Sequence, residues 1–406
     1  MRLFKLKSMK INSQKGLTLV ELLIAAFLGL LLTATIGAMY VTSVSGFRST
    51  NELSRVQENN RFAMHFLQQS IRQAGYSLCG NRTRDYSFLI DPFNSTVGGG
   101  LVGYEFDGTS SGESFDLTYV NLNSSSTDAE VVAARAANAG NLADWNSAVG
   151  LTDPAPDLTN IVNNFFPVAG SDIIAVTMEQ LEPDMDVTGS NANRLNVTLL
   201  NGADALPQGA IVKAGDCVER NVFVKENTGA NINANNGTAN GNLVPASRDP
   251  SGQPFSQAWD GGTTVYSDVT RVFFVGTGIS GLPSLFVYES ICGFLTVADG
   301  CLENAVANEL VEGVESMQVV YGVDSDGDGV ANQYLAADEI VAPADLTDVV
   351  TVRVSLLLRA NEFSEAVNPG ETFTLADNVE IVPVNQGQGT LRFVSTATVE
   401  LRSRGD

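Results

Sequence analysis

One apolar segment near the N-terminus limits the folds open to this 406-residue chain. Residues 22–41 have Thr33 and Thr35 as their only clearly polar members. About 20 apolar residues are enough for one helix to cross the hydrocarbon core of a membrane. The sequence therefore predicts a transmembrane span at about 22–41.

The residues before this span are basic. Residues 1–15 contain five Lys or Arg side chains and no acid. Basic residues remain on the cytoplasmic side of a span, so we expect the N-terminus inside and the bulk of the chain outside. A secretory signal would have an A-x-A-like cleavage site after the apolar region, whereas here the small residue Gly16 precedes it.

A carboxylate, Glu21, stands at the start of the apolar segment. A charge in the hydrocarbon centre costs roughly 2.5 to 3.5 kcal/mol on insertion scales, so an acid in such a segment indicates a function. Glu21 therefore needs a partner or an interface.

The segment Lys15-Gly16-Leu17-Thr18-Leu19-Val20-Glu21 resembles the prepilin signal of type IV pilins and pseudopilins. The resemblance implies that prepilin peptidase removes the leader, residues 1–16, by cutting after Gly16 and then methylates the new N-terminus on Leu17. Leu17 departs from the usual Phe but remains apolar. The new amine of one subunit would pair with Glu21 of a neighbour, so Glu21 is expected to fix the register of helix packing in a filament.

The helix is predicted to continue beyond the membrane. Apolar residues recur every three or four positions over residues 51–76, which is typical of an amphipathic helix. Gly75 is a suitable stop, because glycine tolerates the left-handed conformation at a helix end. We therefore expect one pilin helix over 17–76.

From residue 77 to residue 406 the pattern changes to short β-branched and aromatic runs bounded by turn residues. This predicts a large β-rich exported head and, with the helix, an α+β fold. Two polar insertions, about 123–165 and 226–265, are expected to be long loops. The predicted strands are 114–122, 172–179, 194–200, 220–226, 269–276, 284–290, and two lying within 347–360 and 390–403.

The charge of the chain argues against polyanionic partners. The formal charge is −23, and loss of the leader's five basic residues gives −28 for the mature side chains. Such an acidic surface repels nucleic acid and anionic lipid, so no nucleic-acid partner is expected.

All four cysteines follow the span, where an oxidising compartment permits disulfides. Four cysteines allow three connectivities, and the sequence leaves them open. We favour Cys292–Cys301, which closes a short loop, together with Cys79–Cys217.

The acidic segment from Asp324 to Asn332 resembles the first half of a calcium loop. The candidate ligands are the carboxylates of Asp324, Asp326 and Asp328, the carbonyl of Val330 and the side chain of Asn332. The twelfth position, Leu335, lacks the bidentate acid of an EF-hand. An acidic turn without an ion is the equal alternative.

Further blocks look like those of the PilW family of minor type IV pilins: residues 56–80, 310–340, 348–360 and 391–404. The resemblance implies a role in pilus assembly or priming. The implied partners are other minor and major pilins, prepilin peptidase and the inner-membrane assembly machinery. The implied location is the bacterial inner membrane with the head in the periplasm, followed by the pilus at the cell surface.

Two other functions stay open, a minor pseudopilin of type II secretion and a tip-located adhesive module. The PilW-like blocks argue against the pseudopilin. An enzyme is not expected, because the single histidine, His65, stands on the predicted amphipathic helix and no G-x-S-x-G, H-E-x-x-H or P-loop motif is present. No cofactor is required, and calcium is the one candidate ligand.

Overall fold

The computed structural model divides the chain into two compact units, Met1–Glu52 and Leu53–Asp406. The residues that it describes are 18–79, 83–87, 100–118, 127–147, 156–191, 194–234, 242, 259–291, 306–340, 346, 348–363, 371–384 and 390–402.

The predicted long N-terminal helix is confirmed as α1, Leu19–Arg72, with 54 residues. Its first part is long and apolar enough to cross a membrane. The three glycines of this part lie within the helix and do not end it. At the first of them, the Thr33 hydroxyl donates a hydrogen bond of 2.7 Å to the Gly29 carbonyl. The hydroxyl is thereby satisfied within the helix, as an apolar surrounding requires.

The second part of α1, from Leu53 onward, packs within the head. Its buried side chains recur at helical spacing and join the main hydrophobic core. The helix ends three residues before Gly75, which has φ +65° and donates its N–H to the Thr177 carbonyl at 2.9 Å. The residues that α1 and its final turn contribute to the core are Val56, Ala63, Met64, Leu67, Ile71 and Ala74.

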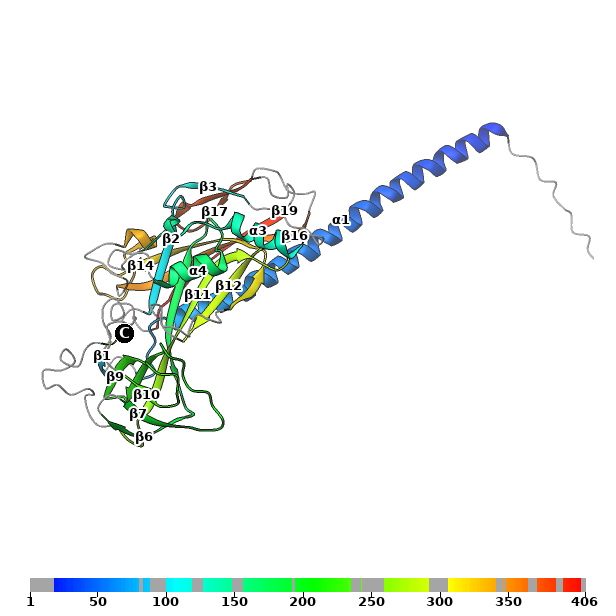
Figure 1. Ribbon diagram of the computed structural model, residues 1–406. Coiled ribbons are helices and arrows are strands. Elements are labelled where there is room, and N and C mark those ends of the chain that lie inside the picture. The colour runs from blue at the N-terminus through cyan, green and yellow to red at the C-terminus, as the bar shows by residue number, and fades with distance from the viewer. Residues whose placement is uncertain are drawn as a thin grey trace, which may run out of the picture. The chain divides into compact units, whose positions relative to one another are not determined.

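The largest sheet has nine strands in the order β1-β9-β8-β11-β5-β2-β4, with β12 and β13 continuing from β11 (Figure 1). Its pairs are antiparallel except β1 with β9. The strands are β1 Arg84–Ser87, β2 Leu101–Phe106, β4 Trp145–Ser147, β5 Ile173–Leu181, β8 Ile211–Gly215, β9 Glu219–Val224, β11 Thr264–Thr277, β12 Pro283–Ser290 and β13 Ala307–Glu312.

Alternating side chains of β11 serve two different cores. Phe273 and Val275 join the core that contains α1. Val272 and Phe274 join a second core beneath the helix α4, Pro156–Phe165. Both faces of β11 are therefore covered at residues 272–275, which explains why this stretch is apolar on both sides.

A four-stranded sheet, in the order β15-β14-β16-β19, shares the core with α1. The two sheets approach closely where Gly103 of β2 faces β14. A Cβ at Gly103 would lie 2.0 Å from the Tyr321 hydroxyl, so only glycine fits there. The strands are β14 Val314–Val323, β15 Gln333–Leu335, β16 Val349–Phe363 and β19 Thr390–Glu400.

Two small sheets complete the head, β10-β7-β6 and β17-β18-β3. The first covers a separate core around Trp259. In the second, β18 pairs parallel with β3. The strands are β3 Ser114–Leu117, β6 Met185–Asn191, β7 Arg194–Leu199, β10 Ile232–Asn233, β17 Phe373–Thr374 and β18 Glu380–Pro383.

The prediction of a long loop over 123–165 is wrong. This insertion holds helix α3, Asp128–Asn138, the 3-10 turn η1, Leu142–Asp144, the strand β4 and helix α4. A reciprocal capping box between Thr127 and Glu130 starts α3. The second insertion, 226–265, contains β10 and the start of β11, and residues 235–241 and 243–258 lie outside the described residues.

Candidate functional site

The N-terminal end of α1 holds the candidate assembly acid. Glu21 accepts hydrogen bonds from the Thr18 backbone N–H at 2.9 Å and from its hydroxyl at 3.0 Å, and the Thr18 hydroxyl accepts the Glu21 N–H at 3.3 Å. This is a capping box. The acid thus has partners within its own subunit, in addition to the predicted partner in a neighbour. Gly16 and Leu17, the predicted processing residues, lie outside the described residues.

Sequence reasoning missed this capping box although its signal was readable. A Thr followed three residues later by a Glu, just before an apolar run, is the usual signature. The carboxylate also lies in the first helical turn, where the positive end of the helix dipole favours an anion. Glu21 therefore has a local role in starting α1.

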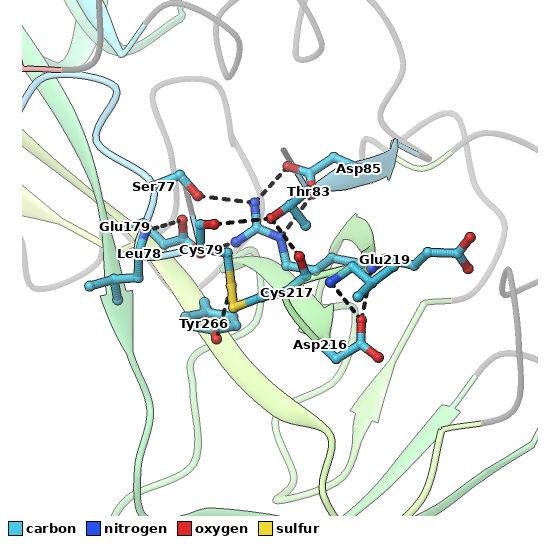
Figure 2. Close-up of a disulfide and its surroundings, with 12 residues drawn as sticks. Ser77, Leu78, Cys79, Thr83, Asp85, Glu179, Asp216, Cys217, Glu219 and Tyr266 are labelled. Carbon is cyan, nitrogen blue, oxygen red and sulfur yellow. Dashed lines mark hydrogen bonds and ion pairs between the residues drawn. A yellow bond between two sulfur atoms is a disulfide. The ribbon is translucent and has the colours of Figure 1, made fainter. Parts of the chain in front are cut away.

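A disulfide joins Cys79 to Cys217, the pairing favoured from the sequence, with Cα atoms 5.0 Å apart (Figure 2). The Cys79 sulfur lies 3.3 Å from the Tyr266 hydroxyl. Thr83 donates its hydroxyl to the Cys217 carbonyl at 3.2 Å. The bridge attaches the segment that follows α1 to the turn between β8 and β9. Cys292 and Cys301 lie outside the described residues.

A buried arginine next to the disulfide holds the same two segments together. Arg220, 2% exposed, forms ion pairs with Glu179 and with Asp85. Its Nε and Nη2 donate to the two carboxylate oxygens of Asp85 at 2.8 Å each, a bidentate geometry. Nη2 also donates to the Ser77 hydroxyl at 3.3 Å. Figure 2 shows these partners around the bridge. None of these contacts was predicted, because their members are far apart in the chain.

The candidate calcium ligands lie at the tip of the β14–β15 hairpin. Asp324, Asp326 and Asp328 each offer a carboxylate oxygen, and these oxygens approach within 4.8 Å of one another. Asp324 accepts backbone N–H groups, the shortest from Gly327 and Gly329 at 2.7 Å. The hydrogen bond from Gly329, with others from the same loop, holds the pKa of Asp324 below its usual range.

Of the other predicted calcium ligands, the Asn332 side chain already has a partner. The Asn332 side chain accepts the Ser325 N–H at 2.7 Å, and the Val330 side chain is exposed. Leu335 pairs with Tyr321 within the sheet. The structure thus brings the three carboxylates together, and loop amides already stabilise two of them, since Asp328 accepts the Val330 N–H at 2.8 Å.

A pair of buried acids forms a site that was not predicted. Glu105 of β2 and Asp172, just before β5, are 3% and 2% exposed and hydrogen-bond to each other. Asp172 accepts the N–H groups of Phe106 at 3.2 Å and Val319 at 2.8 Å. Glu105 accepts the Thr109 hydroxyl at 3.2 Å.

Burial raises the pKa of both acids, to about 11 for Glu105 and about 7 for Asp172. Two carboxyl groups can share a hydrogen bond only if one is protonated. The backbone donors stabilise the charge of Asp172, so Glu105 holds the proton. The pair binds β2 and β14 to the segment before β5.

His65 is exposed on α1. It lines a surface groove with Phe62 of the same helix and Leu310 of β13. This position fits the surface role predicted for the single histidine.

Comparison with known families supports what the fold and the N-terminal segment indicate. The prokaryotic N-terminal methylation motif matches residues 11–37, which include Gly16, Leu17 and Glu21. With the long α1 and the β-rich head, this match defines a prepilin-type protein with an apolar N-terminal helix.

A second family, described as Type IV Pilus-assembly protein W, matches residues 272–403, which run from within β11 to just past β19. This part of the chain, 132 of its 406 residues, is thus similar to the PilW family of type IV pilus assembly proteins, and the N-terminal segment carries a prepilin-type methylation motif. No curated protein and no solved structure matches the chain.

Proposed function

We propose that the chain is a minor pilin that is cut after Gly16, N-methylated on Leu17 and then inserted into a type IV pilus. The observation that carries this proposal is the co-occurrence of the methylation motif and the PilW match in one chain. The subunit would remain in the inner membrane through α1, with the head in the periplasm, until the pilus machinery extracts it. Its neighbours would be other minor and major pilins. The role is structural, and it uses no catalytic residue.

Processing tests the proposal directly. In cells with prepilin peptidase, mass spectrometry of the mature chain should find N-methyl-Leu17 as its first residue. Gly16→Val should leave the leader attached, because a branched side chain would obstruct a peptidase site that accepts glycine. Gly37→Val is the matched control, since a Cβ at Gly37 has no neighbour within 4 Å. An intact leader in the wild-type chain would overturn the proposal.

Glu21 allows a second test, which separates its two roles. Glu21→Val removes the charge and the cap, whereas Glu21→Gln removes the charge but keeps an oxygen for the Thr18 N–H. If the charge fixes filament register, both variants should insert in the membrane while their content in purified pili falls about tenfold or more, in line with the cost of breaking a charge pair. Normal incorporation of Glu21→Gln would leave Glu21 with the capping role alone.

We further propose that the β14–β15 hairpin binds calcium weakly through Asp324, Asp326 and Asp328, because three hard oxygen ligands converge there. The absence of an acid at Leu335 suggests a Kd of about 10⁻⁴ to 10⁻³ M. Millimolar calcium should then stabilise the head by about 1 kcal/mol.

Thermal unfolding with and without calcium measures this effect. The upward shift of Tm should vanish in Asp326→Asn with Asp328→Asn, which keeps the shape of the loop. An unchanged wild-type Tm in several millimolar calcium would identify an acidic turn.

A further inference from the structure

A pocket of about 500 Å³ opens on the head between the helices of the first insertion and the large sheet. Its wall includes a row of phenyl rings. Phe274 of β11 stacks on Phe165 of α4 at 5.9 Å and on Phe286 of β12 at 5.6 Å, with interplanar angles of 20° and 9°. Pockets of this volume suit small molecules, and aromatic walls favour planar apolar groups.

The pocket also contains a cation, Arg135 of α3. Its Nε is buried and has no hydrogen-bond partner within the part of the chain that the structure describes. A buried donor without an acceptor is costly, so an acceptor is expected in the space that it lines.

The nearby carboxylate, Glu309 of β13, already has other donors. It accepts the Ser284 hydroxyl at 2.7 Å and the Ile279 N–H at 3.2 Å. No ion pair between Arg135 and Glu309 occurs among the described residues. The guanidinium therefore remains available to an anion from outside.

Two features of the rim are also typical of binding sites. Val132 and Ile279 line the pocket, and they are 59% and 82% exposed. Phe166, beside the pocket, has φ +51°, which is rare for a residue other than glycine and costs energy. Such strained residues cluster at ligand sites.

We propose that this pocket binds a small organic acid that carries an aromatic ring. The ring lies against Phe165, Phe274 and Phe286, and the carboxylate pairs with the Arg135 guanidinium, whose N–H groups match a carboxylate geometrically. The proposal is separate from the pilin function, because it concerns a ligand of the head and not assembly of α1.

The test uses the full-length chain in detergent micelles and 3-phenylpropionate as the probe, followed by saturation-transfer NMR titration. We expect saturable binding that Arg135→Gln weakens about tenfold or more, the size of a lost charge-assisted hydrogen bond. Phe286→Leu, which keeps an apolar side chain but removes a ring, should also weaken it. All titrations use the same detergent concentration, so that partition of the probe into micelles affects every variant equally.

Two controls keep the outcome clear. Uncharged 3-phenylpropanol should bind about tenfold more weakly than the acid. Arg271→Gln, which removes an arginine that pairs with Glu289 outside the pocket, should bind the acid as the wild type does. Absence of saturable binding, or equal affinity in Arg135→Gln and the wild type with an unchanged Tm, would overturn the proposal.

Discussion

Replacing Arg220 by methionine is expected to lower the free energy of unfolding of the head by about 3 to 5 kcal/mol. The substitution leaves the carboxylate of Glu179, which is 1% exposed, without the cation that compensates its charge. It also removes the bidentate contact with Asp85. Urea unfolding followed by tryptophan fluorescence measures this effect, since both tryptophans, Trp145 and Trp259, are buried in the head.

The same substitution at Arg271 is the matched control. Arg271 pairs with Glu289, which is 52% exposed, and surface pairs contribute about 0 to 1 kcal/mol. The double variant Arg220→Met with Glu179→Gln should recover part of the lost stability, because the uncompensated charge is gone. A loss below about 1 kcal/mol in Arg220→Met would show that water reaches Glu179 in the folded head.

Glu105→Gln is expected to make the head less sensitive to alkaline pH. The folded-state pKa of Glu105, about 11, lies above the ordinary value of 4.5, so the folded head holds a proton that the unfolded chain releases. Raising the pH through this window favours the unfolded chain, by up to about 1.4 kcal/mol for each pH unit. Glutamine keeps a donor toward Asp172 and has no proton to lose.

The stability of the variant should therefore exceed that of the wild type by up to about 5 kcal/mol at pH 8, and the two should converge near pH 4.5. Urea unfolding at several pH values measures this difference. Acids with raised pKa values outside this pair, such as Asp268, contribute equally to both proteins. Glu400→Gln, at an exposed position of β19, should follow the wild-type curve. Parallel curves for Glu105→Gln and the wild type would contradict a shared proton.

Each predicted strand segment contains at least part of a strand, because alternation and β-branched runs are local signals. The strands with which these segments pair could not be predicted from the sequence. Strands that follow one another in the chain do not all pair with each other. For example, β18 pairs in parallel with β3, which lies much earlier in the sequence. Sheet order depends on which apolar faces can be buried together, and residues far apart in the chain decide this.

The prediction of a long loop for the first insertion, residues 123–165, was wrong for a different reason. Its Asn, Ser and Ala content predicted a loop, but the capping box at Thr127 and the helical spacing of Leu158, Ile161 and Val162 were present in the sequence. Short helices of about ten residues are marginal alone. Here α4 is stabilised by burying these side chains over β11, an energy that composition does not reveal.

The sequence by itself determined the features that depend on neighbouring residues. These are the apolar span, the processing motif and the acidic hairpin tip, which were predicted, and the capping box that starts α1, which was readable but missed. The groups of each lie within a few residues of one another. Only the tertiary structure decided the contacts of Arg220 and Glu105. Glu179 and Arg220 are 41 residues apart, and Glu105 and Asp172 are 67 apart. Such groups meet only because burial of the apolar faces of the sheets brings them together, and burial then sets the strength of the ion pair and the proton affinity of the acids.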